Sequence, residues 1–175
     1  MKRILVRQNS EVFVGEYLFN TQLKEELCDI LENHSDVQSR KTHVKATMTD
    51  WEWDPKSDRL KRLKNRIKDE ILVNFSDVAD FKSELFLKYV NFWGNVYRKG
   101  DYTNSHHHQA NNFSFVYFLK AKWYYPPLVF TESGKKIRPK EGRYVIFPGH
   151  LLHHVPKQWV KETRITLSAN LDIVK

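Results

Sequence analysis

The sequence predicts a mainly β domain with two flanking helices in its N-terminal part, and three observations support this prediction. The second half of the chain consists of short aromatic or β-branched runs separated by turns rich in Gly, Pro, Asn or Lys, as in antiparallel sandwiches and barrels. Two segments of the first half instead repeat apolar residues at helical spacing. The composition is 41% hydrophobic and 14% aromatic, which is typical of a globular protein rich in β-forming residues.

We expect a single domain over residues 1–175, with a helical N-terminal part over about 1–83 and a jelly-roll core over about 84–175. This length is sufficient to bury a hydrophobic core. The sequence contains no internal repeat, low-complexity segment or linker that would divide it. The two helices are expected to pack on the outer sheet of the core.

The individual elements follow from local patterns. Helices are predicted over 21–34 and 58–75, because both segments carry an apolar stripe at helical spacing with charged residues elsewhere. Residues 44–49 suggest a short strand. Trp51 and Trp53 follow it and could either cover a substrate or cover the core, and packing is the commoner role of large aromatic residues. The other β-type runs lie within 3–7, 11–19, 84–98, 112–120, 122–130, 143–147 and 163–173.

The cysteine content and the hydropathy pattern indicate a cellular compartment. The single cysteine, Cys28, excludes an internal disulfide and fits a reducing environment. No run approaches the roughly 18 apolar residues that a membrane span requires. The N-terminus begins basic but has no long apolar region, so we do not predict a signal peptide. We therefore expect a soluble cytoplasmic protein without membrane contact.

The net charge of +8 is concentrated in the second half of the chain, where residues 101–175 contain 11 Lys and Arg against 5 Asp and Glu. This excess could face nucleic acid or an anionic substrate, or it could serve solubility alone. The predicted helix over 58–75 also has a basic face. Asp58, Asp69 and Glu70 lie close to that face and favour a solvated surface over a nucleic-acid contact.

A histidine-rich segment over residues 101–109 suggests a metal site. If residues 105–109 are extended, His106 and His108 point to one face of the strand. A His-x-His pair places two imidazoles within reach of one metal ion. The best candidate for a third ligand is His153, which follows a Pro-Gly turn. The alternatives are a solvated histidine loop and an adventitious nickel or zinc binder.

Arg164 follows His153 by eleven residues and lies on the last predicted strand. An arginine that points inward needs a counter-charge, because a buried unpaired guanidinium is costly. A dicarboxylate whose other end chelates the metal would supply this charge in bidentate geometry. The hydroxyl of Thr166, two residues later, would fall on the same face. The alternative is a surface arginine paired with Glu162.

Several segments resemble the 2-oxoglutarate/Fe(II)-dependent oxygenases, including phage and bacterial members. They are residues 93–102 with His106-x-His108 and 113–119, then 141–149 with His153-x-Val155, and finally 164–170. The resemblance covers about residues 85–173. It implies a double-stranded β-helix, a cupin-like jelly roll, with Fe(II) bound by the three histidines and the C5 carboxylate of 2-oxoglutarate bound by Arg164. Further candidates for the 2-oxoglutarate pocket are Tyr102, Tyr117, Asn95 and Thr166.

The activity implied by this resemblance is a dioxygenase that uses 2-oxoglutarate and O2 to hydroxylate an unidentified substrate, in the host cytoplasm if the protein is phage-encoded. One position departs from the wider family, which has Asp or Glu where this chain has His108. An imidazole there leaves the site one unit more positive, although iron sites with three histidines are chemically reasonable.

A cupin motif selects the same three histidines and therefore offers a rival interpretation. Gly100-x5-His106-x-His108 matches its opening, but the glutamate that normally follows is missing, as is the asparagine after the last histidine. Under this interpretation the protein is a non-catalytic metal-binding module or a phage accessory protein. Arg164 separates the two interpretations, because only the oxygenase needs it to bind 2-oxoglutarate.

Overall fold

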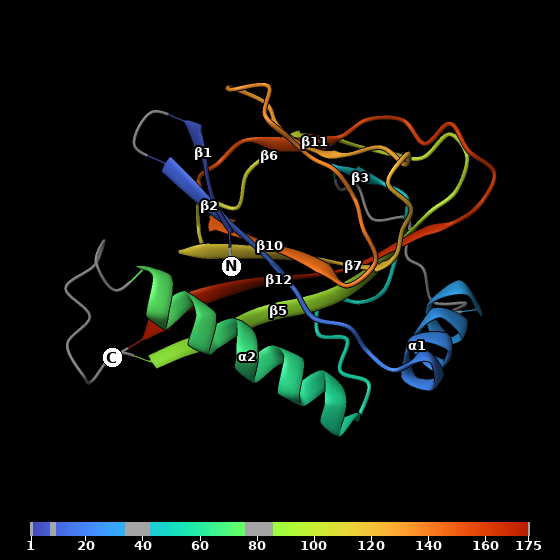
Figure 1. Ribbon diagram of the computed structural model, residues 1–175, viewed down its shortest axis with the longest axis horizontal. Helices are drawn as coiled ribbons and strands as arrows, with labels where there is room; N and C mark the ends of the chain where they lie inside the picture. The colour runs from blue at the N-terminus through green and yellow to red at the C-terminus, as the bar shows by residue number, and fades with distance from the viewer. Residues whose placement is uncertain (1, 8–9, 34–42, 76–85, 175) are drawn as a thin grey trace.

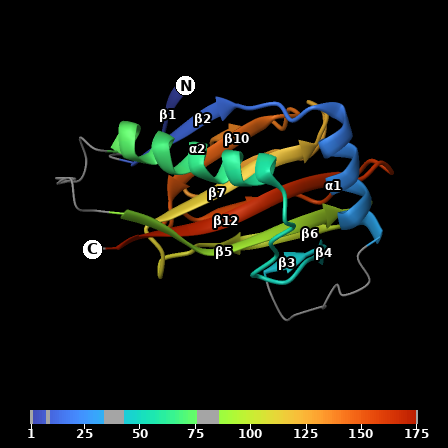
Figure 2. The same ribbon diagram turned by 90° about the horizontal axis from the view of Figure 1, so that it is seen from below.

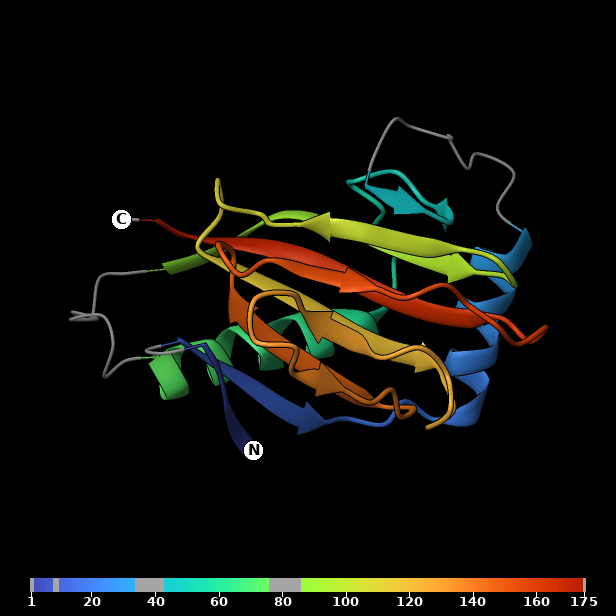
Figure 3. The same ribbon diagram turned by 90° about the horizontal axis from the view of Figure 1, so that it is seen from above.

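The computed structural model describes residues 2–7, 10–33, 43–75 and 86–174. Within these ranges two antiparallel sheets lie one above the other, and two helices lie beneath the larger sheet (Figure 1). The helices lie in front of the strands in Figure 2 and behind them in Figure 3, which views the opposite side. The prediction of a mainly β fold with two helices is confirmed.

The larger sheet has seven strands in the spatial order β1-β2-β10-β7-β12-β5-β4. Its strands are β1 (Lys2–Arg7), β2 (Ser10–Glu16), β10 (Arg143–Pro148), β7 (Phe113–Lys120), β12 (Arg164–Val174), β5 (Phe86–Tyr97) and β4 (Thr47–Met48). The smaller sheet has five strands in the order β3-β6-β11-β8-β9. These are β3 (Val44–Lys45), β6 (Tyr102–His106), β11 (His153–Val155), β8 (Leu128–Phe130) and β9 (Lys136–Ile137).

Strand β12 runs through the middle of the larger sheet and pairs with β5 on one side and β7 on the other. Because successive side chains of a strand point to opposite faces, its two faces differ in chemistry. The core shared with the helices contains the side chains of one face of β12, which are Ile165, Leu167, Ala169 and Leu171. Arg164, Thr166 and Ser168 instead line a cavity beside the smaller sheet. The apolar face therefore holds the helices, and the polar face is left for the site.

The helices α1 (Thr21–Asn33) and α2 (Asp58–Phe75) bury their predicted apolar stripes against the larger sheet. The side chain of Asn20 caps α1 by accepting a hydrogen bond from the backbone N–H of Leu23, at 3.1 Å. Leu31 packs directly on Gly94 of β5, where a Cβ would overlap the leucine side chain. Glycine at this position therefore permits close approach of helix and sheet.

Two sequence predictions need correction. The strand expected over 122–130 is reduced to β8, because a turn closed by the hydrogen bond from Tyr125 N to Lys122 O and the pair Pro126-Pro127 precede it. The extended conformation expected over 105–109 ends at His106, the last residue of β6. The boundary expected near residues 83–84 lies outside the described residues. No helix of the described chain is long and apolar enough to cross a membrane.

Replacing Ile67 by alanine should destabilise the protein and leave the histidine cluster unaffected. Ile67 is fully buried between α2 and the larger sheet, so its truncation should lower the free energy of unfolding by about 2–4 kcal/mol. Val73→Ala on the same helix is the control, since Val73 is 73% exposed and should change stability by less than about 0.5 kcal/mol. Urea unfolding measures both variants, and equal effects would contradict the packing described.

Candidate metal centre and cavity

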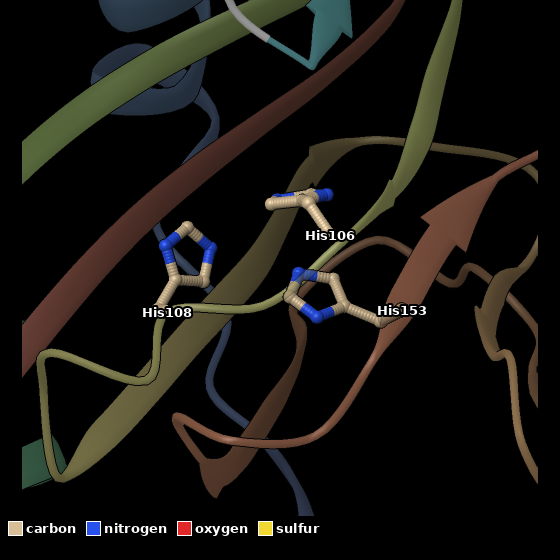
Figure 4. Close-up of side chains that lie close together, drawn as sticks. All are labelled: His106, His108 and His153. Carbon is tan, nitrogen blue, oxygen red and sulfur yellow. The ribbon is translucent and has the colours of Figure 1, made fainter.

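Three histidine side chains meet on the inner side of the smaller sheet (Figure 4). His106 ends β6 and His153 begins β11, and the two residues are partners in the antiparallel register. His108 follows two residues after the end of β6. One ligand nitrogen of each ring lies within 4.8 Å of the other two. The structure thus brings together the three predicted ligands at a spacing that one metal ion can bridge.

A β-bulge in β6 decides which of its residues face the cavity. His153 lies opposite His106 and Val155 lies opposite Thr103, so three steps along β6 match two along β11. The extra residue reverses the alternation of side chains. Thr103 is consequently buried and lines the same cavity as His106, whereas Tyr102 is 36% exposed and lines a separate hollow. The structure does not bring Tyr102 to the predicted 2-oxoglutarate pocket.

Main-chain carbonyls orient two of the three rings. The Nδ1 atom of His106 lies 2.9 Å from the carbonyl oxygen of Asn104, and Nδ1 of His153 lies 2.9 Å from that of Leu151. A carbonyl oxygen only accepts, so Nδ1 carries the proton in both rings. The free lone pair of each ring is therefore on Nε2. This Nδ1–H tautomer is the one that lets Nε2 bind a metal ion while Nδ1 donates to a carbonyl oxygen.

Burial keeps the three histidines neutral. Desolvation lowers the pKa of His106, lowers that of His108 to about 3, and lowers that of His153 well below its usual value. Each ring also feels the positive charge that a neighbouring histidine would acquire. Metal ligation needs a neutral imidazole, so burial keeps the three rings in the charge state that a metal ion requires at neutral pH.

Gly149 holds the segment that carries His108. The N–H of His108 donates to the carbonyl oxygen of Gly149 at 2.7 Å, and the N–H of Gly149 donates to that of Asn112 at 2.9 Å. A Cβ at Gly149 would overlap the carbonyl oxygens of Asn111 and His108. From the sequence this glycine is predicted only as part of a turn, because a contact with a segment about forty residues away has no local sequence pattern.

The cavity beside the histidines has a volume of about 40 Å3, and the side chain of Arg164 forms part of its wall. Arg164 is 1% exposed, and its Nε and Nη1 atoms have no hydrogen-bond partner among the described residues. The rings of Tyr97 and Phe118 face its guanidinium at 4.7 and 5.3 Å from their centroids. Glu162 instead pairs with Lys122 at 3.8 Å. The alternative of a surface arginine paired with Glu162 is therefore wrong.

Desolvation lowers the pKa of Arg164, and the interaction with Tyr97 offsets this only in part. A guanidinium remains charged in proteins even so, and a buried charge without a counter-ion is costly. The residues present therefore fit an anionic ligand that enters this cavity and pairs with Arg164. Tyr97 is a site residue that the sequence analysis missed, although its place two residues after Asn95 on the same strand was a usable signal.

Asn95 and Thr166 both line this cavity, as predicted for the ligand pocket. The amide of Asn95 donates to the hydroxyl of Thr166 at 3.3 Å and to that of Ser168 at 3.1 Å, and it accepts from the indole of Trp93 at 3.1 Å. Tyr117 lies elsewhere, since its hydroxyl donates to a main-chain carbonyl in the core shared with the helices. The structure therefore does not bring Tyr117 to the pocket.

An open hollow of about 530 Å3 adjoins the histidines on the side of His108. Trp51 lines this hollow and contacts the ring of Trp93, whereas Trp53 stacks on Phe92 of the helix-side core. Trp53 therefore packs against the core, whereas Trp51 lies at the hollow beside His108. Most of the other lining groups are carboxamides, from Asn91, Gln109, Asn111 and Asn170.

The remaining histidines near the cluster do not join it. His107 is exposed and lines the open hollow, and His150 is also exposed. The Nδ1 atom of His154 lies 2.9 Å from the hydroxyl of Thr131. None of the three belongs to the group of close ligand nitrogens found among the described residues.

Solved structures of similar fold include prolyl hydroxylases and a member of the 2OG-Fe(II) oxygenase family from Burkholderia pseudomallei. The viral collagen prolyl hydroxylase vCPH of Paramecium bursaria Chlorella virus-1, as its 2-oxoglutarate complex, has a TM-score of 0.69 at 12% identity, with 91% of this chain and 94% of that chain covered. A Pseudomonas putida prolyl-4-hydroxylase has a TM-score of 0.67 at 14% identity, covering 92% and 91%. HygX of Streptomyces hygroscopicus, with nickel and 2-oxoglutarate bound, has 0.66 at 10% identity, covering 92% and 82%.

No protein-family model matches this sequence, and no curated protein sequence matches it significantly. At identities of 10–14% the structural similarity establishes the fold and leaves the chemistry to the residues of the site.

The metal-free protein should lose stability as the pH falls below about 6.5. Burial lowers the pKa of His108 to about 3, so between these values the unfolded chain binds a proton at this position and the folded chain does not. Stability then falls by about 1.4 kcal/mol per pH unit for such a histidine. Urea unfolding between pH about 7 and about 5 should give a shallower pH dependence for His108→Gln than for wild type. Parallel curves would show that His108 titrates normally.

Gly149→Ala should weaken metal binding by displacing the segment that carries His108. The added methyl group meets main-chain oxygens, which cannot rotate away, so we expect a loss of about 1–3 kcal/mol in stability. Gly94→Ala is the control, because its methyl group meets only the flexible side chain of Leu31 on the helix side. Thermal unfolding and Co(II) titration should show weaker metal binding for Gly149→Ala alone. Unchanged Co(II) affinity in that variant would contradict a role of Gly149 in positioning His108 for metal binding.

Proposed function

We propose that this protein is an Fe(II)/2-oxoglutarate-dependent dioxygenase with a double-stranded β-helix fold, and that it hydroxylates an unidentified substrate. The observation that carries the proposal is the combination of a three-histidine cluster with a buried, unpaired arginine in one cavity. Solved structures of similar fold include 2-oxoglutarate complexes and a nickel-bound protein, which supports this assignment of the ligands.

His106, His108 and His153 would hold the iron through one nitrogen each. With only three protein ligands, the metal ion would be able to bind a chelating cosubstrate and O2 as well. The bound iron, with 2-oxoglutarate and O2, supplies the oxidising chemistry for hydroxylation. The protein would contribute the position of these groups and a small cavity lined mostly by buried side chains.

Arg164 would bind the carboxylate of 2-oxoglutarate that lies farther from the iron. Its Nε and Nη1 atoms have no hydrogen-bond partner among the described residues, so a carboxylate that enters the cavity would accept a charge-assisted hydrogen bond that the protein leaves unmade. The aromatic rings of Tyr97 and Phe118 fix the guanidinium in place. Thr166 adds a hydroxyl on the same strand and the same face.

The replacement of a carboxylate by His108 favours an anionic ligand. Three neutral imidazoles leave the charge of a divalent ion uncompensated, and Arg164 adds a further positive charge to the same cavity. A dianionic cosubstrate would neutralise most of this charge on binding. The open hollow at Trp51 and His108 would then be the side from which the substrate approaches.

Arg164→Met should abolish 2-oxoglutarate binding and retain metal binding. Methionine keeps much of the side-chain volume but removes the guanidinium, so we expect the affinity for 2-oxoglutarate to fall by at least about 100-fold. The measurement is the visible spectrum of anaerobic Fe(II)-protein during titration with 2-oxoglutarate, where chelation gives a weak charge-transfer band. Arg98→Met, at an exposed arginine bonded to Thr47, is the matched control and should titrate like wild type.

Three other outcomes of this titration would contradict the proposal at different points. Wild-type protein that binds Fe(II) without developing the band would favour the non-catalytic cupin-like module. An Arg164→Met variant that titrates like wild type would remove Arg164 from the cosubstrate site. Absence of Fe(II) binding would remove the metal site itself.

A further inference from the structure

The carboxamide of Asn170 contacts His108 on the side of the ring that faces away from the other histidines. The Nδ2 atom of Asn170 lies 3.4 Å from Nδ1 of His108. Figure 4 shows one ring nitrogen of His108 directed toward His106 and His153 and the other directed away from them. Asn170 lies on β12, six residues after Arg164 on the same face, and is 2% exposed.

Two contacts fix Asn170 without fixing the orientation of its amide. Its backbone N–H donates to the side-chain oxygen of Asn91 at 3.2 Å, which anchors the main chain. Its Oδ1 accepts a hydrogen bond from the hydroxyl of Ser114 at 2.8 Å. A hydroxyl can donate or accept, and the two ends of a carboxamide have nearly the same shape. Rotation of the amide by half a turn would therefore preserve its contact with the Ser114 hydroxyl and its contact with the His108 ring.

The orientation of this amide decides which nitrogen of His108 carries the proton. With Nδ2 toward the ring, Nδ1 of His108 must accept, and the proton is then on Nε2. That proton occupies the lone pair that a metal would need. With Oδ1 toward the ring, Nδ1–H of His108 donates to it and Nε2 is free, while Nδ2 of Asn170 donates to the hydroxyl of Ser114.

We propose that Asn170 is a positioning residue for the metal centre, and that its carboxamide turns its oxygen toward His108 when a metal binds. His106 and His153 are held by main-chain carbonyls, whose oxygens cannot be exchanged for donors. His108 is thus the ligand whose tautomer depends on a side chain. The inference builds on the proposed three-histidine site and adds a residue that the proposed function does not require.

The test compares metal affinity in three variants of the metal-free protein, by competition with a chromophoric chelator for Co(II). Asn170→Ala removes the acceptor for Nδ1–H and should bind Co(II) about 10- to 100-fold more weakly than wild type. Asn170→Asp presents an oxygen in either orientation and should bind at least as tightly as wild type. Asn111→Ala is the control, since the side chain of Asn111 lines the same hollow and bonds to Asp172 but to no histidine ring, and the substitution keeps its backbone N–H, which donates to the carbonyl oxygen of His108. It should leave the affinity unchanged.

A second measurement needs no metal and does not depend on the alanine variant folding. Nitrogen-15 spectra of the histidine rings distinguish the two neutral tautomers. In the metal-free protein, His108 should be protonated on Nε2 in wild type and on Nδ1 in Asn170→Asp. Protonation on Nδ1 in metal-free wild type would overturn the rotation of the amide.

The outcomes also separate this inference from the proposed function. Equal Co(II) affinity in wild type, Asn170→Ala and Asn170→Asp would overturn the role of Asn170 and leave the three-histidine site intact. Weaker binding in Asn170→Asp than in Asn170→Ala would do the same. Absence of Co(II) binding in wild type would overturn both the proposed function and the inference.

Discussion

The alternation of side chains along β12 is the constraint on which the rest of the structure depends. Each residue of this central strand must face either the helices or the cavity, and the two environments demand opposite chemistry. The apolar residues of one face are held under α1 and α2. The other face presents Arg164, Thr166, Ser168 and Asn170 in a row, all of them buried. A half-turn of this strand would place the guanidinium in the hydrophobic core and leave the helices without a surface to cover.

The polar face of β12 is stable only because neighbouring strands supply partners for most of its groups. Asn95 on β5 satisfies the hydroxyls of two residues, and Ser114 on β7 bonds to the amide of Asn170. Arg164 is the exception, with two nitrogen atoms that remain without a partner among the described residues. Leaving donors of a buried charge unsatisfied is costly for folding. Such a cost is expected where a ligand completes the site.

The histidine cluster depends on a different constraint, the pairing of β6 with β11. The register sets His106 directly opposite His153. The bulge between Thr103 and His106 directs the side chains of Thr103 and His106 to the same cavity. His108 lies beyond the strand and is placed by main-chain hydrogen bonds to Gly149. Two of the three histidines are therefore fixed by a sheet ladder and the third by a turn. The third is also the one whose ring contacts a side chain rather than a carbonyl.

The sequence by itself determined both helices, most strands and the group of His106, His108, His153 and Arg164, because periodicity and residue chemistry are local properties. Tyr102 was misplaced because a bulge reverses the alternation, and a bulge arises from the register between two strands. Tyr117 was misplaced as well, because the strands that flank β7 decide which face of the sheet its side chain occupies. The roles of Gly149 and Asn170 were decided only by the tertiary structure, since each acts on His108 from a segment about forty or more residues away. Contacts of this kind depend on strand pairing and leave no pattern in the neighbouring sequence.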